Sequence, residues 1–142
     1  EEGLKLPTVT GLTIENRFLG EPMSKEKDRV DVLKEIGEAL NKSKIKVSSV
    51  DISNINNIII NKGDVKILLG NSDKLSDKLT KMVNILNDPA GNFEKGYINI
   101  SFNGNPVIYK EKEGGVLFEE VVFTNYYRYS LCFVRVFINL PI

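Results

Sequence analysis

A chain of 142 residues, 42% of them hydrophobic, is long enough to bury one sizeable core, and this predicts a single globular unit. Its 19 basic and 19 acidic residues cancel, which argues against a nucleic acid, an anionic membrane surface or an acidic substrate as the partner. The chain has no histidine, so Ser-His and Cys-His catalytic arrangements are excluded and the most common zinc ligand is missing.

The first elements predicted are a short extended stretch and an amphipathic helix. Pro7 and Gly11 bracket the extended stretch, and Ser24 stands where a helix N-cap is expected. Apolar residues then recur at helical spacing until residues 41–43, with charged residues mostly between them. This pattern predicts a helix that packs on the core through Val30, Leu33, Gly37 and Leu40.

Three strands and a second helix are predicted next. Hydrophobic and polar residues alternate over residues 45–52, and two further apolar runs occupy residues 58–60 and 65–69, so a three-strand meander is expected. Residues 70–73 would cap the second helix, which would end before Pro89. Its buried side is predicted to be Leu75, Leu79, Met82, Val83 and Leu86, and its lysines Lys74, Lys78 and Lys81 are assigned to the solvated side.

The last part of the chain is predicted to form further strands. Residues 97–102 and 107–109 alternate in polarity and are separated by a turn that ends at Pro106. Residues 116–142 are aromatic and apolar, as is typical of two or three strands, and Cys132 is expected there as a small buried hydrophobe.

These elements predict an α+β fold. A mixed or antiparallel β-sheet would carry two amphipathic helices packed on one face, with strands from the C-terminal segment at its edge. Residues 1–115 are expected to form one domain, and residues 116–142 a β-rich extension added to the same sheet.

Residues that could support chemistry are few. The carboxylate pairs Asp28 with Asp31 and Asp51 with Asp64 could in principle act as acid and base, but exposed helix and turn positions favour solvated or capping roles. No metal-ligand spacing and no phosphate-binding loop is found, so neither a metal nor a cofactor is predicted. The aromatic and arginine residues 126–129 are assigned to sheet packing rather than to base stacking.

A half-exposed sheet offers another kind of site, because unpaired strand edges accept an added strand from a partner. Residues 97–109 are the predicted edge, since they alternate in polarity, have a tyrosine at both ends and are interrupted by Gly104 and Pro106.

The order of several segments resembles a known family. These segments are residues 6–12, a capped helix, residues 50–52, residues 65–70, Lys78-Leu79 in a second helix and residues 96–102. In the order of these six segments the chain resembles the β domain of FtsQ/DivIB bacterial cell-division proteins. The resemblance extends over residues 4–109. The frequent Asn and Lys residues are typical of a clostridia-like, Gram-positive source.

The resemblance implies a non-catalytic scaffold of the division complex. Members of this family have a cytoplasmic tail, one transmembrane helix, a POTRA domain and then the β domain on the extracytoplasmic side, at the septum. The resemblance implies binding to FtsB/DivIC-type and FtsL-type partners in support of septal peptidoglycan synthesis. The partner segment would pair along the last family strand, which corresponds here to Tyr97, Ile98, Ile100, Phe102, Asn103, Gly104, Val107 and Tyr109.

Alternatives remain at this stage. A peptidoglycan-binding or hydrolytic envelope domain would use Asp51 and Asp64, and a secreted β-rich adhesin would bind no division protein. Residues 116–142 have no counterpart in the family. They could fold back onto the predicted docking edge or swap between chains to form a homo-oligomer.

Overall fold

The computed structural model describes residues 5–15, 19–20, 24–89, 93–111, 117–124 and 132–139. Over these residues the chain forms an α+β fold, which confirms the predicted class. The elements in chain order are β1 (Thr8–Thr10), α1 (Lys27–Ser43), β2 (Ser49–Asp51), β3 (Ile58–Lys62), β4 (Asp64–Gly70), α2 (Leu75–Asn87), β5 (Lys95–Asn99), β6 (Val107–Lys110), β7 (Leu117–Thr124) and β8 (Cys132–Asn139).

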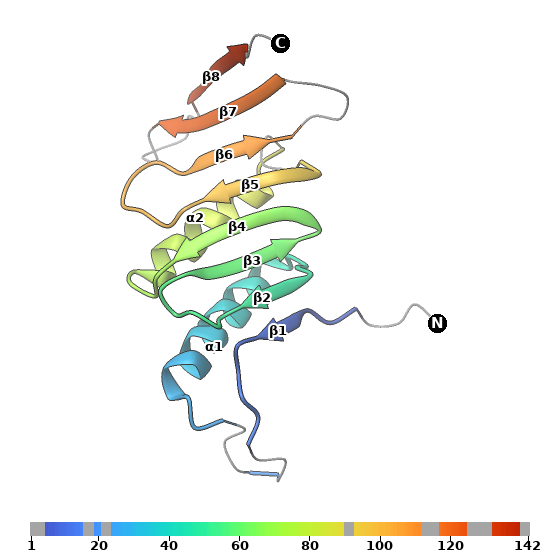
Figure 1. Ribbon diagram of the computed structural model, residues 1–142, viewed down its shortest axis with the longest axis vertical. Coiled ribbons are helices and arrows are strands. Elements are labelled where there is room, and N and C mark those ends of the chain that lie inside the picture. Colours follow the sequence, from blue (N-terminus) through green and yellow to red (C-terminus); the bar gives the residue numbers. More distant parts are fainter. Residues whose placement is uncertain are drawn as a thin grey trace.

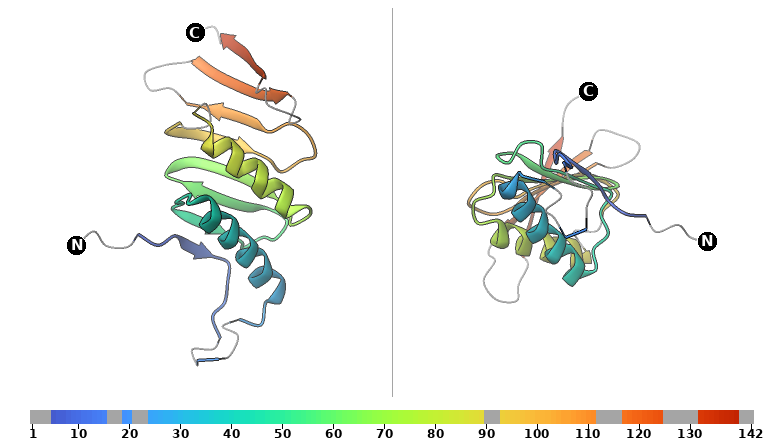
Figure 2. Two further views of the ribbon diagram at one scale, coloured as in Figure 1. Left: turned by 180° about the vertical axis from the view of Figure 1, so that it is seen from behind. Right: turned by 90° about the horizontal axis from the view of Figure 1, so that it is seen from below.

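The described strands form one open sheet in which spatial order follows chain order, from β1 at one edge to β8 at the other (Figure 1). Only the pairs β1–β2 and β4–β5 are parallel, and the other neighbours are antiparallel. Each parallel pair is connected through a helix, as parallel pairing requires. Both helices lie on the same face of the sheet, so the opposite face has no helix over it (Figure 2).

The core lies between the helices and the covered face of the sheet. One residue from each of five neighbouring strands forms a continuous buried row across the sheet, made of Val50, Ile60, Ile67, Ile98 and Ile108. From the helix side this row is covered by Ile36, Leu79 and Met82, among others. Each such side chain stabilises the fold by about 1.5–3 kcal/mol through burial, so this row fixes the strand register.

Helix α1 differs from the prediction in its start and in its buried face. It begins at Lys27 after Glu26, and the Ser24 hydroxyl accepts a hydrogen bond from the Glu26 amide (3.2 Å) without capping the helix. The fully buried residues are Val32 and Ile36. Of the predicted core face, Leu33 and Leu40 are partly buried and pack against the core, whereas Val30 and Gly37 are exposed. The predicted stripe contained a glycine, and turning the helix toward the branched residues buries more apolar surface.

Helix α2 has the predicted buried side, but its start is different. Leu75, Leu79, Met82 and Leu86 are buried and Val83 is partly buried, as expected from their spacing. Residues 70–73 do not cap the helix. The residue before its first turn is Lys74 in the left-handed region (φ 50°), and the Asp73 carboxylate accepts a hydrogen bond from the Asn71 side-chain amide instead (2.8 Å).

Lys78 is buried, with 7% exposure, although the sequence assigned it to the solvated side of α2. Its ammonium group donates to the Asn71 carbonyl oxygen (2.9 Å) and to Asn71 Oδ1 (2.7 Å), and so fixes the connection between β4 and α2. Burial lowers the pKa of this ammonium group below its ordinary value of 10.5, because the charged form loses hydration. The two Asn71 oxygens and the nearby charge of the Asp73 carboxylate compensate part of this lost hydration.

The depressed pKa of Lys78 predicts a stability that rises at alkaline pH. The folded chain releases this proton at a lower pH than the unfolded chain, so the free energy of unfolding increases as pH rises from the folded pKa toward 10.5. Urea denaturation of the wild type and of Lys78→Met at about pH 7 and about pH 10 should show the wild type gaining stability relative to the variant. Parallel pH profiles would contradict this assignment.

No helix in the described part of the chain is both long and apolar enough to cross a membrane.

Candidate docking edge

Residues 97–109, predicted as the edge of the sheet, form parts of two antiparallel strands and the loop between them. Strand β5 lies between β4 and β6, and the far side of β6 pairs with β7. In this structure the segment is therefore not an edge, and that prediction is corrected. Residues 117–124 supply the strand that covers it, as in the fold-back alternative.

The eight predicted docking residues separate into two groups. The side chains of Ile98 (0% exposed) and Ile100 (1% exposed) lie in the core and cannot touch a partner. The other six are exposed or half-buried, namely Tyr97, Phe102, Asn103, Gly104, Val107 and Tyr109. A surface formed by the first strand, the loop and the second strand remains, and we call these six residues the β5–β6 surface.

Two tyrosines dominate the helix-free face at this position. The rings of Tyr97 and Tyr109 lie on directly paired residues of β5 and β6 and stack, with 5.1 Å between centroids and 15° between planes. Burial raises the pKa of the Tyr109 hydroxyl, so this hydroxyl is uncharged at neutral pH. Val107 is half-buried two residues away from Tyr109 along β6, and so lies on the same face. This apolar and aromatic surface is open to contact by another chain.

The loop between β5 and β6 is held by polar contacts that leave Phe102 outward. The Asn99 side-chain oxygen accepts hydrogen bonds from the Ser101 amide (3.0 Å) and hydroxyl (2.7 Å), which forms a tight turn at the end of β5. The ammonium group of Lys81 on α2 donates to the Gly104 carbonyl oxygen (3.2 Å). Phe102 is 42% exposed on this anchored loop. A large apolar side chain fixed at the surface is the type of residue that anchors protein interfaces.

The main chain of β6 has one defined pairing side. The Glu111 amide donates to the Lys95 carbonyl oxygen of β5 (2.9 Å). Since main-chain groups alternate sides along an antiparallel strand, the amides and carbonyls of Ile108 and Lys110 point the other way, toward β7. The register places Ile108 opposite Val121 and Lys110 opposite Glu119. Ile108 and Lys110 were not singled out from the sequence as pairing residues. The alternation of main-chain groups between the two sides of a strand could have indicated them.

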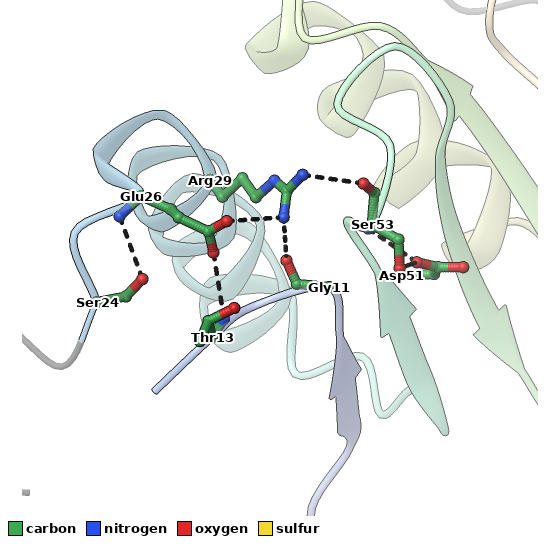
Figure 3. A network of polar contacts seen from close by, with 7 residues as sticks. All are labelled: Gly11, Thr13, Ser24, Glu26, Arg29, Asp51 and Ser53. Atoms are coloured by element: carbon green, nitrogen blue, oxygen red, sulfur yellow. Dashed lines mark hydrogen bonds and ion pairs between the residues drawn. The ribbon is translucent and has the colours of Figure 1, made fainter. Parts of the chain in front are cut away.

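A polar network at the other end of the sheet has a structural role (Figure 3). The Arg29 guanidinium donates to the carbonyl oxygens of Gly11 (2.8 Å) and Ser53 (3.1 Å), and to the Glu26 carboxylate (3.0 Å). The other Glu26 carboxylate oxygen accepts a hydrogen bond from the Thr13 amide (3.2 Å). These contacts tie the start of α1 to the end of β1 and to the loop after β2, so the charges satisfy one another.

The carboxylates considered for acid–base chemistry are not brought together. Asp51 lies opposite Ile59, which lies opposite Leu68, while Asp64 stands at the start of the same strand as Leu68. Two strands across and four residues along correspond to about 16 Å, well beyond the separation that glycoside hydrolysis uses. Asp28 and Asp31 are exposed on the first turns of α1.

Asp51 is also unsuited to act as an acid. Its carboxylate accepts hydrogen bonds from the Ser53 hydroxyl (2.6 Å) and the Ser53 amide (2.9 Å), and these bonds lower its pKa below 3.8. A general acid needs a raised pKa. Within the described residues no group of three or more His, Cys, Asp or Glu side chains could hold a metal ion. The assignments of residues 126–129 to sheet packing and of the Cys132 side chain to a buried site fall outside what the structure describes.

Comparison with known proteins identifies the domain. A cell division protein DivIB of Clostridium tetani is 30% identical over 113 residues, which is 76% of this chain and 43% of the relative. A DivIB of Clostridium botulinum strain Loch Maree is 30% identical over 115 residues, and one of Clostridium acetobutylicum is 26% identical over 106 residues. The chain contains a DivIB/FtsQ-like domain.

The DivIB/FtsQ-like domain spans less than half the length of these relatives, between 43% and 45%. No family model matches the chain, and no solved structure matches it either. The curated DivIB proteins confirm the resemblance read from the order of the segments. They do not test which residues of this DivIB-like domain contact a partner.

Proposed function

We propose that this domain is a non-catalytic scaffold of bacterial cell division that binds another division protein by strand addition next to β6. The similarity to DivIB proteins at 26–30% identity is the observation that carries the proposal. The domain works on the extracytoplasmic side of the cell membrane at the septum, in a protein with a single transmembrane helix. Its partners are FtsB/DivIC-type and FtsL-type proteins, and the complex supports septal peptidoglycan synthesis.

The chemistry of the β5–β6 surface supports this role. Strand addition needs main-chain groups that form the ladder and nearby side chains that select the partner. On β6 the main chains of Ile108 and Lys110 are the ladder groups. The stacked tyrosines lie on β5 and β6, and Phe102 is exposed on the loop that joins these two strands. A partner segment with alternating apolar residues fits such a surface, because every second side chain of an extended strand faces the same way.

The experiment is a binding titration of the full chain with the soluble part of a DivIC/FtsB-type partner. Phe102 is exposed, so Phe102→Asp should leave the domain folded and weaken binding by about tenfold or more, as loss of an interface anchor does. The control is Leu19→Asp, a fully exposed hydrophobic residue on the connection from β1 to α1, at the opposite end of the sheet. Ile100 is not used because a charge in the core would unfold the domain.

Two results would contradict the proposal. One is an unchanged affinity of Phe102→Asp for the partner, with thermal unfolding midpoints of both variants equal to that of the wild type. The other is equal loss of affinity in Phe102→Asp and Leu19→Asp, which would mean that any added charge disturbs binding.

A further inference from the structure

We propose that the hairpin formed by β7 and β8 is a competitor built into the chain. It occupies the edge of β6 to which the partner strand would bind, so the partner can dock only when β7 leaves. This inference rests on the proposed function, and it adds a regulatory step to the same site. In the absence of a partner the edge is already paired and protected from other strands.

Strand β7 pairs with β6 over fewer residues than it pairs with β8. Strand β7 pairs with β8 from Leu117 to Thr124, the whole length of the strand, whereas its ladder with β6 covers only Val107–Lys110. The two strands extend beyond the part of the sheet that the helices cover (Figure 2). A hairpin that keeps its own ladder can separate from β6 by breaking one short ladder.

Pairing with β7 and pairing with a partner exclude each other. Neighbouring strands lie about 4.7–4.9 Å apart and share the same main-chain groups, so one side of β6 has room for one strand. The outward amides of this strand belong to Ile108 and Lys110, and they already face Val121 and Glu119. Pro106, just before β6, has no amide and cannot lengthen the ladder at that end.

A disulfide can hold the hairpin closed without changing the fold. Since Ile108 and Val121 form a hydrogen-bonded pair, the adjacent pair Val107 and Val122 is not hydrogen-bonded. At such pairs the Cα atoms are about 4.5 Å apart, within the range that a disulfide spans. The variant is Val107→Cys with Val122→Cys in a Cys132→Ser background, and partner binding is measured for its oxidised and reduced forms. The control carries Val107→Cys and Cys132→Ser only.

A second variant opens the hairpin. Val121→Pro removes the amide that pairs with Ile108, so β7 loses part of its short ladder, and every core residue whose side chain the structure describes is kept. Hydrogen exchange at the amides of Ile108 and Lys110 reports pairing without any partner. These amides should be protected in the wild type and exchange faster in Val121→Pro.

The proposal expects partner affinity to rise from the oxidised variant through the wild type to Val121→Pro, with the oxidised form roughly tenfold or more weaker than the reduced form. Equal affinity of all forms would overturn the competitor role and leave the proposed function standing. Absence of binding in every form, including Val121→Pro, would overturn the proposed function itself. A disulfide that links two chains at low protein concentration would show a swapped hairpin and overturn the in-chain assignment.

Discussion

Replacing Ile67 by alanine should lower the free energy of unfolding by about 3–5 kcal/mol, as expected for a fully buried residue at the centre of the core. Ile67 is 0% exposed and stands at the centre of the buried row, between Ile60 on β3 and Ile98 on β5. Its removal leaves a cavity. The neighbouring strands cannot move to fill it because their backbone hydrogen bonds hold them in place, and the helices above are held by the packing of their side chains. Urea denaturation followed by circular dichroism measures the loss.

The matched control is Ile14→Ala, which deletes the same atoms from a side chain that is 60% exposed. Its effect should remain within about 0.5 kcal/mol of zero. Equal losses for the two substitutions would mean that the row through Ile67 is not the centre of the core.

The strands of the central sheet were predictable because their pattern is local. Residues 58–60 on β3 and residues 65–69 on β4 are short apolar runs, and such runs predict strands. The alternation of buried and less buried residues along them, which defines the covered face, comes from the packed structure. The helix pattern of α2 was equally clear. For α1, several rotations of the helix about its own axis would place apolar residues toward the core. Only the packed structure shows that Val32 and Ile36 are buried and that Val30 is exposed.

The features missed from the sequence depend on long-range contacts. Lys78 is buried because the chain after β4 carries the Asn71 oxygens to its ammonium group, and no spacing rule encodes that path. Whether the outer side of β6 is paired likewise depends on where β7 lies in the sheet. Residues 97–109 were recognised as strand-forming, but whether a strand is an edge is a property of the whole sheet.

The backbone at Gly96 leaves no room for an added methyl group, and Gly96→Ala should cost at least about 2 kcal/mol. Gly96 has φ 142°, a conformation that residues with a Cβ rarely adopt, and a Cβ placed there would lie 2.0 Å from the Tyr109 carbonyl oxygen. Strand β6 must therefore move away from β5, which weakens the ladder between them and separates the stacked rings of Tyr97 and Tyr109.

Because Gly96 positions β6, its substitution should affect the docking edge as well as stability. Hydrogen exchange at Ile108 and Lys110 should accelerate in Gly96→Ala, since β6 then holds neither neighbour in register. The control is Gly37→Ala on the exposed side of α1, where a Cβ meets no atom within 4 Å. Alanine there should stabilise the helix by up to about 1 kcal/mol. If Gly96→Ala unfolded at the wild-type urea concentration, the close approach of β5 and β6 would be refuted, and with it the placement of the tyrosine stack beside the docking edge.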